Sequence, residues 1–342
     1  MAVVNASILI PGFYEPPSHL INPHTEQAGA ETIEWLRRMG IIETEADENR
    51  VRGFQLNYWA GLTVNDAPPE RFLPYCKFAF YFTLLDDHLE TMDSMEAVRR
   101  FRRQVVDILG ARTAELPGGQ ASPWLRAFAD LWPQITDHLS EQATQRFIRY
   151  YLDSVDCTGL EILHRLNGTT PTLAQYLPLR FNTVAMNYTP LAGQNAMRLE
   201  LPDELAEHYL MAEALRCGTD LVGWANDLES YQEEMKQGHT CNLIAVIAAS
   251  EECSIEDAAD RTHKWIRQRQ KDLLDIEEAL PSLVTDLALP PEAAMAASGF
   301  LTFIKSAFWA FVMFCEVSGR YQEVSENSGV AASVEALRGN LR

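Results

Sequence analysis

Apolar residues recur every three or four positions along most of the chain, which is the spacing of amphipathic helices. Stretches with this pattern span residues 23–40, 46–62, 70–92, 140–168, 202–238 and 290–318. A further stretch begins at residue 254. No segment alternates strictly between apolar and polar residues, as a half-buried strand would. With only 18 Gly and 17 Pro among 342 residues, the chain has few helix-breaking positions. The pattern predicts an all-α fold.

The helical pattern also indicates how the chain is divided. Residues 1–23 are rich in proline and irregular, so we expect an N-terminal arm laid over the body of the protein. The loop-forming run at 111–122 is no domain linker, because helical periodicity resumes directly after it. We therefore expect one helical domain over residues 24–322, followed by a C-terminal tail over 323–342.

Two other segments are expected to be irregular. Pro178 and Pro190 interrupt a helical pattern between residues 170 and 197. Because proline kinks a helix and leaves backbone carbonyls without their usual donors, we expect a kinked helix there. The run LPSLVTDLALPPE at 280–292 is expected to form a turn region before the last helix.

A first acidic cluster follows an almost wholly apolar run, FAFYFTLLDDHLE. Phe78, Phe82, Asp86 and Glu90 lie at i, i+4 spacing, so an aromatic stripe leads along one helix face to carboxylates. Asp86 and Asp87 repel each other beside this apolar surface, and without a cation or a strong donor one of them would protonate. The alternative is a polar end on a core helix, with the phenylalanines as ordinary core residues.

A second cluster lies in the run NDLESYQEE, on another predicted helix. Asn226, Ser230 and Glu234 follow at i, i+4, i+8, and each step drifts by only about 40° around the helix, so all three lie on one stripe. Amide, hydroxyl and carboxylate oxygens are hard ligands that suit Mg²⁺. Taken alone, the same spacing also describes a solvated helix face.

With these two clusters in this order, the chain resembles class I terpene synthases of the bacterial and fungal single-domain type. Arg180 lies 46 residues before Asn226, similar to the position of the diphosphate-sensing arginine of that family. The pair Arg320 and Tyr321, in SGRY, is similar to the C-terminal Arg-Tyr pair of the family. The segments INPHTEQA and GHTCNLI also resemble family sequence. The resemblance extends over residues 21–322.

The resemblance implies a single-domain α-helical bundle around a central apolar active-site cavity. It also implies three Mg²⁺ ions, with Mn²⁺ as an alternative, held by oxygen ligands of both clusters: Asp86, Asp87, Glu90, Asn226, Ser230 and Glu234. The diphosphate would accept hydrogen bonds from Arg180, Arg320 and Tyr321. The enzyme would be a carbon–oxygen lyase acting on phosphates, which ionises a linear isoprenyl diphosphate and cyclises the cation.

Other residues are expected to contact the substrate. Aromatic faces stabilise a cation, and the candidates are Phe78, Phe82, Trp309 and Phe314. Thr183 and Val184 would lie near the start of the reacting chain, where the family often has a smaller residue than Val184. The family usually has a basic residue where this chain has Glu233, and Lys236 is the candidate that replaces it.

The resemblance favours farnesyl diphosphate, although geranyl and geranylgeranyl diphosphate remain open. Two rivals also remain. A chain-elongating prenyltransferase would show two aspartate-rich motifs, whereas the second motif here is of Asn/Ser/Glu type. A non-catalytic helical protein that binds a lipid would have no need of metal ligands at every one of these positions.

Charge and cysteine content restrict the partners. The 28 Lys and Arg against 48 Asp and Glu leave a formal charge of −20, which repels nucleic acid and anionic membranes. It also repels a diphosphate, so divalent cations must invert the local sign. Six scattered Cys without metal-finger spacing indicate free thiols in a reducing cytoplasm. Since we find no signal peptide or membrane span, we expect a cytoplasmic monomer or homodimer without membrane insertion.

Overall fold

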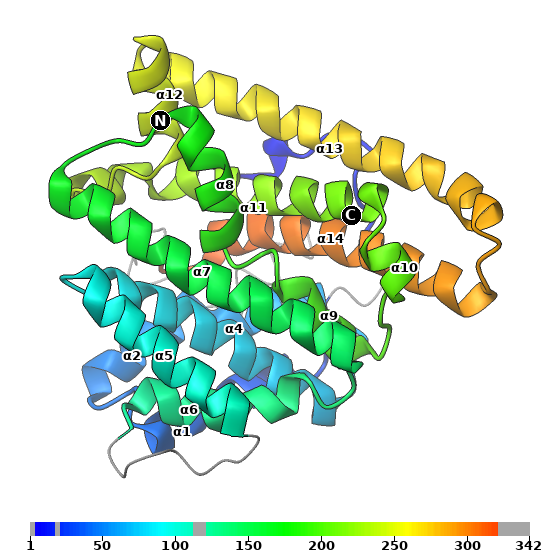
Figure 1. Ribbon diagram of the computed structural model, residues 1–342, viewed down its shortest axis with the longest axis horizontal. Coiled ribbons are helices and arrows are strands. Elements are labelled where there is room, and N and C mark those ends of the chain that lie inside the picture. Colours follow the sequence, from blue (N-terminus) through cyan, green and yellow to red (C-terminus); the bar gives the residue numbers. More distant parts are fainter. Residues whose placement is uncertain (1–3, 18–20, 112–120, 321–342) are drawn as a thin grey trace.

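The structure is a computed structural model that describes residues 4–17, 21–111 and 121–320, and every regular element within these ranges is a helix (Figure 1). The elements up to the middle of the chain are η1 (Ala6–Ile8), α1 (Thr25–Met39), α2 (Glu45–Phe54), α3 (Leu56–Thr63), α4 (Pro69–Glu90), α5 (Met95–Ala111), α6 (Pro123–Leu131), η2 (Trp132–Ile135) and α7 (Glu141–Asn167). The remaining helices are α8 (Leu173–Thr183), α9 (Thr189–Met197), α10 (Asp203–Ala206), α11 (Tyr209–Lys236), α12 (Leu243–Glu251), α13 (Ile255–Asp286) and α14 (Pro291–Val317). The predicted all-α fold is confirmed.

The long helices surround a common centre. Helix α11 packs against α13 on one side and α14 on the other, and α14 packs against α3, which in turn packs against α4. In Figure 1, α13 lies along the upper edge of the molecule, α11 and α14 lie below it, and α7 crosses in front of α4. The buried faces of α4 and α14 are rich in aromatic side chains, so the bundle surrounds an aromatic core.

Helix ends follow local signals in the sequence. Ser140 begins α7 by accepting a hydrogen bond from the Ala143 amide, and Gly168 ends it in the left-handed conformation with φ 59°. Thr172 begins α8 with a capping box, in which its side chain and that of Gln175 accept from each other's backbone amides. These caps place α7 and α8 side by side, so two walls of the site have defined ends.

Three predicted boundaries are wrong. The helix expected at 46–62 is divided into α2 and α3 at Gln55, where φ is 58°. The segment expected at 202–238 is divided into α10 and α11, and the His208 side chain caps the start of α11. The turn expected at 280–292 begins later, because α13 continues through Pro281 to Asp286 while Leu280 and Leu283 stay buried. Burial of these leucines outweighs the cost of the proline.

The expected disruption between residues 170 and 197 is present, and it lies in the segment after Arg180, between the two prolines rather than at either of them. Pro178 lies inside α8, and Pro190 lies in the first turn of α9, where proline is well tolerated. The chain leaves the helix between them, over residues 184–188, and Ala185 takes a φ of 66°. This break turns the chain beside the central cavity, which residues 184–186 and Tyr188 help to line.

The N-terminal arm contacts three elements of the body. Phe13 packs edge to face on Phe308 of α14, with ring centroids 5.8 Å apart. The Ile10 amide donates to the Gln270 side chain of α13, which donates to the Ile8 carbonyl. The amide of Val4 donates to Glu229 of α11 at 2.7 Å. The arm thus ties together α11, α13 and α14.

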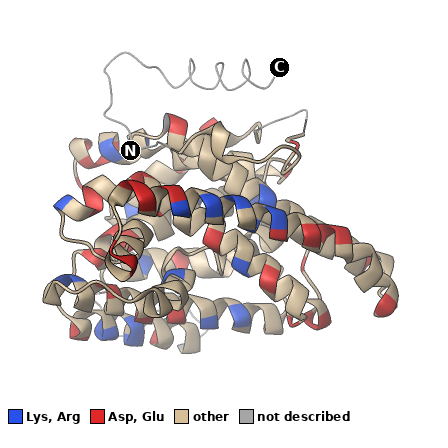
Figure 2. Ribbon diagram, turned by 90° about the horizontal axis from the view of Figure 1, so that it is seen from above, with Lys and Arg blue, Asp and Glu red and all other residues tan. Residues whose placement is uncertain are grey.

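Two long helices differ in their surroundings. Helix α13 carries interspersed basic and acidic residues along its outer side, as is typical of a solvated helix (Figure 2). In the described part of the chain, one helical segment, Pro291–Glu316, has the length and composition of a membrane span, with a mean hydropathy of 1.5. However, 78% of that apolar window is buried inside the bundle, so α14 is a core helix.

Close packing of α9 on α14 gives a test of the fold. A Cβ at Gly193 would lie 2.1 Å from the Phe303 ring, so we expect Gly193→Ala to lower the free energy of unfolding by about 1–3 kcal/mol. The matched control is Gly53→Ala in α2, where no described atom outside the helix's own backbone and the neighbouring residues lies within 4 Å of the added carbon. This variant should gain about 0.5 kcal/mol from its higher helix propensity. Urea unfolding of both variants measures the difference, and equal effects would contradict the packing.

Candidate functional site

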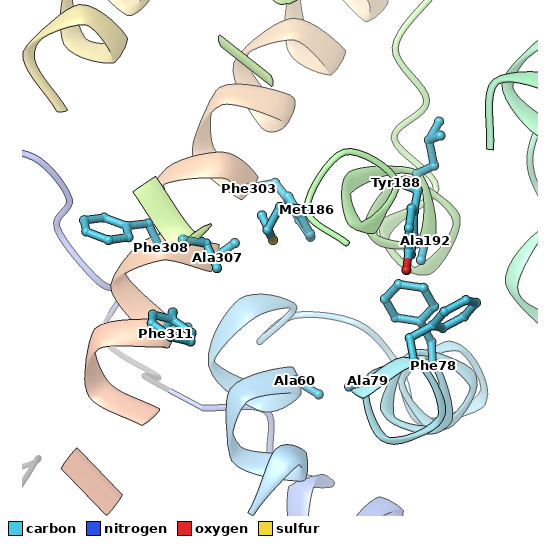
Figure 3. Packing of buried hydrophobic residues seen from close by; sticks show 14 of the residues in the cluster. Ala60, Phe78, Ala79, Met186, Tyr188, Ala192, Phe303, Ala307, Phe308 and Phe311 are labelled. Atoms are coloured by element: carbon cyan, nitrogen blue, oxygen red, sulfur yellow. The ribbon is translucent and has the colours of Figure 1, made fainter. Parts of the chain in front are cut away.

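A cavity of about 160 Å³ lies between α3, α4, α7, α8, α11 and α14. Its lower walls are apolar and largely aromatic, formed by Trp59, Phe78, Phe82, Tyr188, Phe311 and Phe314. The rings of Phe78 and Phe82 lie 4.7 Å apart, and that of Tyr188 lies 5.3 Å from Phe82. In Figure 3, Phe78 on α4 and Tyr188 at the start of α9 point toward each other, whereas Phe311 extends from α14. The cavity can therefore enclose a hydrocarbon chain against aromatic faces.

The two acidic clusters meet at the rim of this cavity. Asp86 of α4 and Asn226 of α11 both line it, as do Arg180 of α8 and Arg320 beyond the end of α14. An adjoining cavity of about 30 Å³ is lined by Glu90 and Glu234, the last carboxylates of the two clusters, and again by Arg180. The polar ends of α4 and α11 thus face each other across a shared opening.

Arg320 is held at the rim by the end of α14 and by α2. Its guanidinium donates two hydrogen bonds to Asp87, with N–O distances of 2.7 and 2.9 Å. Such a bidentate pair fixes the plane of the guanidinium group. The backbone nearby is also fixed, because Ser318 donates to the carbonyl of Phe54 and the Gly319 amide donates to that of Gly53.

The Arg180 side chain lies deeper, where it is only 13% exposed. Its Nη2 atom donates to the side-chain oxygen of Asn226 at 2.5 Å and forms an ion pair with Asp227 at 2.7 Å. Since Arg180 lines both cavities, its guanidinium lies between the two acidic clusters. It is therefore placed to contact an anion bound at the shared opening.

The other candidate ligands of the second cluster, Ser230 and Glu234, are oriented by the helix and by the segment that follows it. The Ser230 hydroxyl donates to the backbone carbonyl of Asn226 at 2.7 Å, one turn earlier. Glu234 accepts a hydrogen bond from the Asn242 side chain at 3.0 Å. Asn242 is fully buried and caps α12 by accepting from the Ile244 amide. The start of α12 thus fixes the last carboxylate of the cluster.

Three acidic side chains near the opening have raised pKa values. Burial, followed by the charge of Asp87, raises the pKa of Asp86 to about 6. Burial and the neighbouring Asp86 and Glu161 raise the pKa of Glu90 well above its usual value. Burial raises the pKa of Glu161 to about 8, although Arg180 and a 2.7 Å hydrogen bond from Thr183 oppose this. The protein alone therefore leaves an excess of negative charge here, which favours a cation.

The donor set fits a divalent cation that shares its ligands with a substrate. Among the described residues, no three carboxylate, imidazole or thiol side chains converge closely enough to hold a metal ion by themselves. The candidate oxygen ligands instead come from α4 and α11, and they line the two cavities that share Arg180. Mg²⁺ is commonly held in this way, by one or two carboxylates together with phosphate oxygens of the substrate.

Comparison with known families identifies the family to which the fold belongs. The profile described as terpene synthase family 2, C-terminal metal binding, matches residues 77–272, which is more than half of the chain. This segment contains both acidic clusters and Arg180. The chain belongs to this family. The resemblance to terpene synthases that the motifs indicated is therefore confirmed.

Individual terpene synthases are similar along nearly their whole length. The chain is 22% identical over 330 residues to 7-epi-alpha-eudesmol synthase from Streptomyces viridochromogenes, covering 94% of each chain. It is 23% identical over 320 residues to germacrene A synthase from Nostoc punctiforme, covering 93% of this chain and 96% of the relative. The solved structure of an a-eudesmol synthase superposes with a TM-score of 0.79 at 21% identity, over 90% of this chain and 99% of that one. The structural match confirms the fold.

Two expected substrate contacts of this terpene synthase lie outside the cavities. Trp309 is buried against Tyr14 of the N-terminal arm, with ring centroids 5.7 Å apart, and does not line the large cavity. Phe311 lies two residues further along α14, so its side chain points about 200° around the helix from that of Trp309. Phe311 lines the large cavity in place of Trp309. Lys236 is exposed and pairs with Glu233 at 3.3 Å, so its side chain turns to solvent. Tyr321 lies outside the described residues.

The other expected contacts, Thr183, Val184 and Phe314, line the large cavity together with Phe78 and Phe82. Sequence reasoning missed several residues of the site, namely Trp59, Tyr188, Phe311, Glu161, Arg165 and Asp227. A signal was present for Glu161, which continues the stripe of Ser154 and Thr158 along α7. Arg165 donates to the carbonyls of Glu90 and Met92 and lines the small cavity, so it is a further basic group at the end of α4 that carries the first cluster.

The raised pKa of Glu161 predicts how stability depends on pH in the terpene synthase without metal. Between about pH 4.5 and 8 the folded state keeps a proton that the unfolded chain has lost, so stability falls as the pH rises through this window. Glu161→Gln keeps an acceptor for the Thr183 hydroxyl and should make the fall in stability with rising pH less steep. Thermal unfolding in EDTA over pH 5–8.5 measures it. The control is Asp153→Asn, an exposed position on the same helix, and a Gln variant as steep as wild type would contradict the assignment.

Proposed function

We propose that this terpene synthase ionises a linear isoprenyl diphosphate, most readily farnesyl diphosphate, and cyclises the resulting carbocation to a terpene hydrocarbon or alcohol with release of diphosphate. The observation that carries the proposal is the convergence of Asp86, Asn226, Arg180 and Arg320 on the rim of one aromatic-lined cavity. An amphiphile with an anionic head and a C15 chain fits this division into a polar rim and an apolar base.

The proposed metal ligands are the six oxygen-bearing side chains of the two clusters. Asp86, Asp87 and Glu90 would serve two Mg²⁺ ions, and Asn226, Ser230 and Glu234 a third, with Mn²⁺ as an alternative ion. When bound, such ions neutralise the charge that develops on the diphosphate as the carbon–oxygen bond breaks. The gathering of half-buried carboxylates at the rim, with the raised pKa values of Asp86 and Glu90, supports this proposal.

The protein's own residues bind the leaving group and exclude water. The guanidinium groups of Arg180 and Arg320 donate charge-assisted hydrogen bonds to the diphosphate, and Tyr321 is proposed to add its hydroxyl. Donors aimed at developing charge lower the barrier to heterolysis without a protein nucleophile. Below the rim, each aromatic face in contact with the cation contributes about 0.5–2 kcal/mol, with Phe78, Phe82 and Phe314 as candidates.

Farnesyl diphosphate is preferred because relatives of similar length are named for it. The eudesmol synthase from Streptomyces viridochromogenes and a (-)-beta-caryophyllene synthase from Saccharothrix espanaensis are both described as cyclising (2E,6E)-farnesyl diphosphate. The chain is 24% identical to the latter over 263 residues. We propose a cytoplasmic monomer or homodimer, in keeping with six free cysteines.

The first test is turnover of defined substrates. Purified protein incubated with geranyl, farnesyl or geranylgeranyl diphosphate and Mg²⁺ should release a volatile terpene, most rapidly from farnesyl diphosphate, as read by gas chromatography. EDTA should abolish the product, because the carboxylates at the rim would repel the diphosphate. A longer prenyl diphosphate would instead show a chain-elongating enzyme. Absence of any product from all three substrates would refute the proposal.

Substitution of one residue from each cluster is the second test. Asp86→Ala and Asn226→Ala should each lower kcat/KM by at least about 100-fold, because each removes a ligand beside the leaving group. Helical circular dichroism should remain that of wild type. Asp93→Asn, at an exposed position just after α4, is the control and should retain activity within about twofold. Full activity in either alanine variant would remove that residue from the site.

A further inference from the structure

Asp227 lies next to the expected ligand Asn226 but faces another way. One residue further along a helix is turned by about 100°, so Asn226 lines the large cavity while Asp227 points toward α8 and α12. Asp227 is fully buried and belongs to the lining of neither the large nor the small cavity. Asp227 can therefore affect the reaction only through another residue that does line the cavities.

The carboxylate of Asp227 is bound by groups from two neighbouring elements. Its Oδ1 atom lies 2.7 Å from Nη2 of Arg180. Its Oδ2 atom accepts hydrogen bonds from the hydroxyl of Tyr176, also on α8, and from the amide of Leu243 at the start of α12, the latter at 2.7 Å. These contacts leave the carboxylate a single orientation, which a buried charge requires if it is to remain ionised.

The same contacts orient the guanidinium of Arg180. Its Nη2 atom forms the ion pair with Asp227 and donates hydrogen bonds to the amide oxygen of Asn226 and, at 3.4 Å, to the carbonyl of Gly223. Its Nε atom is buried and has no hydrogen-bond partner within the described residues, although the side chain lines both cavities. The planar group is thus fixed through Nη2 by three groups of the protein, while the side chain stays at the wall of both cavities.

We propose that Asp227, supported by Tyr176, is a positioning residue that holds Arg180 in the orientation needed to bind the leaving diphosphate. The inference rests on the proposed function and adds to it a residue that never touches the substrate. Arginine has a long, flexible side chain, and a fixed guanidinium loses little freedom when charge develops on the leaving group. Without Asp227, this orienting step would have to occur during the reaction.

The experiment compares two buried aspartates on the same helix. Asp227→Asn removes the charge that pairs with Arg180 but keeps the shape of the side chain and an acceptor for the Leu243 amide. Asp220→Asn is the matched control, because Asp220 is also buried on α11, pairs with Arg269 at 2.9 Å and lines neither cavity. Both variants should lose thermal stability, and kcat and KM are measured for each with farnesyl diphosphate and Mg²⁺.

We expect Asp227→Asn to lower kcat by at least about 30-fold and to change KM by less than about threefold, since the lost interaction acts mainly in the transition state. Asp220→Asn should keep kcat within about twofold. In an Arg180→Lys background, which lacks the planar group to be oriented, Asp227→Asn should add less than about threefold. Additive effects, or an equal loss of kcat in both aspartate variants, would overturn the inference in favour of a merely structural role.

If Asp227→Asn does not fold, Tyr176→Phe decides the question, because it removes only one donor to the same carboxylate. It should lower kcat by about three- to tenfold without a matching change in KM, and an unchanged kcat would contradict the inference. Failure of the proposed function itself looks different. In that case the wild-type protein turns over none of the isoprenyl diphosphates, whereas failure of this inference leaves wild type active and Asp227→Asn equally so.

Discussion

Partial burial of several carboxylates at the rim of an apolar cavity is the constraint on which the rest of the structure depends. Like charges taken out of water raise one another's pKa values, as Asp86 and Glu90 show, and the arrangement persists only if cations lie nearby. Two arginines from distant elements, Arg180 and Arg320, supply part of this charge from the protein. The remaining positive charge would come from divalent metal ions, which would allow an enzyme of net charge −20 to bind a diphosphate.

The fold serves this rim by fixing the ends of its helices. Residues after α14 are tied to the end of α2, which places Arg320 opposite Asp87. The start of α12 holds both Glu234 and Asp227, so the turn after α11 determines the geometry of the second cluster. Chemistry at the rim is therefore sensitive to segments that never contact the cavity.

The break between α8 and α9 links the polar and apolar parts of the site. Arg180 lies just before it and Tyr188 is its last residue, so one irregular segment positions both the proposed donor for the leaving group and an aromatic wall of the cavity. Water exclusion follows from the same arrangement, because residues of α4, α7 and α14 close the cavity below the rim. Ionisation and cation stabilisation are thereby kept at opposite ends of one space.

The sequence by itself determined the helical class, both acidic clusters and the aromatic stripe of Phe78 and Phe82, because each depends on spacing along one helix. Only the tertiary structure decided which faces meet. Trp309 and Phe311 are equally apolar, but the packing of α14 directs one to the N-terminal arm and the other to the cavity. Likewise, Asp227 and Glu161 read as ordinary helix carboxylates until neighbouring helices bury them, since burial and ion pairing arise from contacts between distant segments.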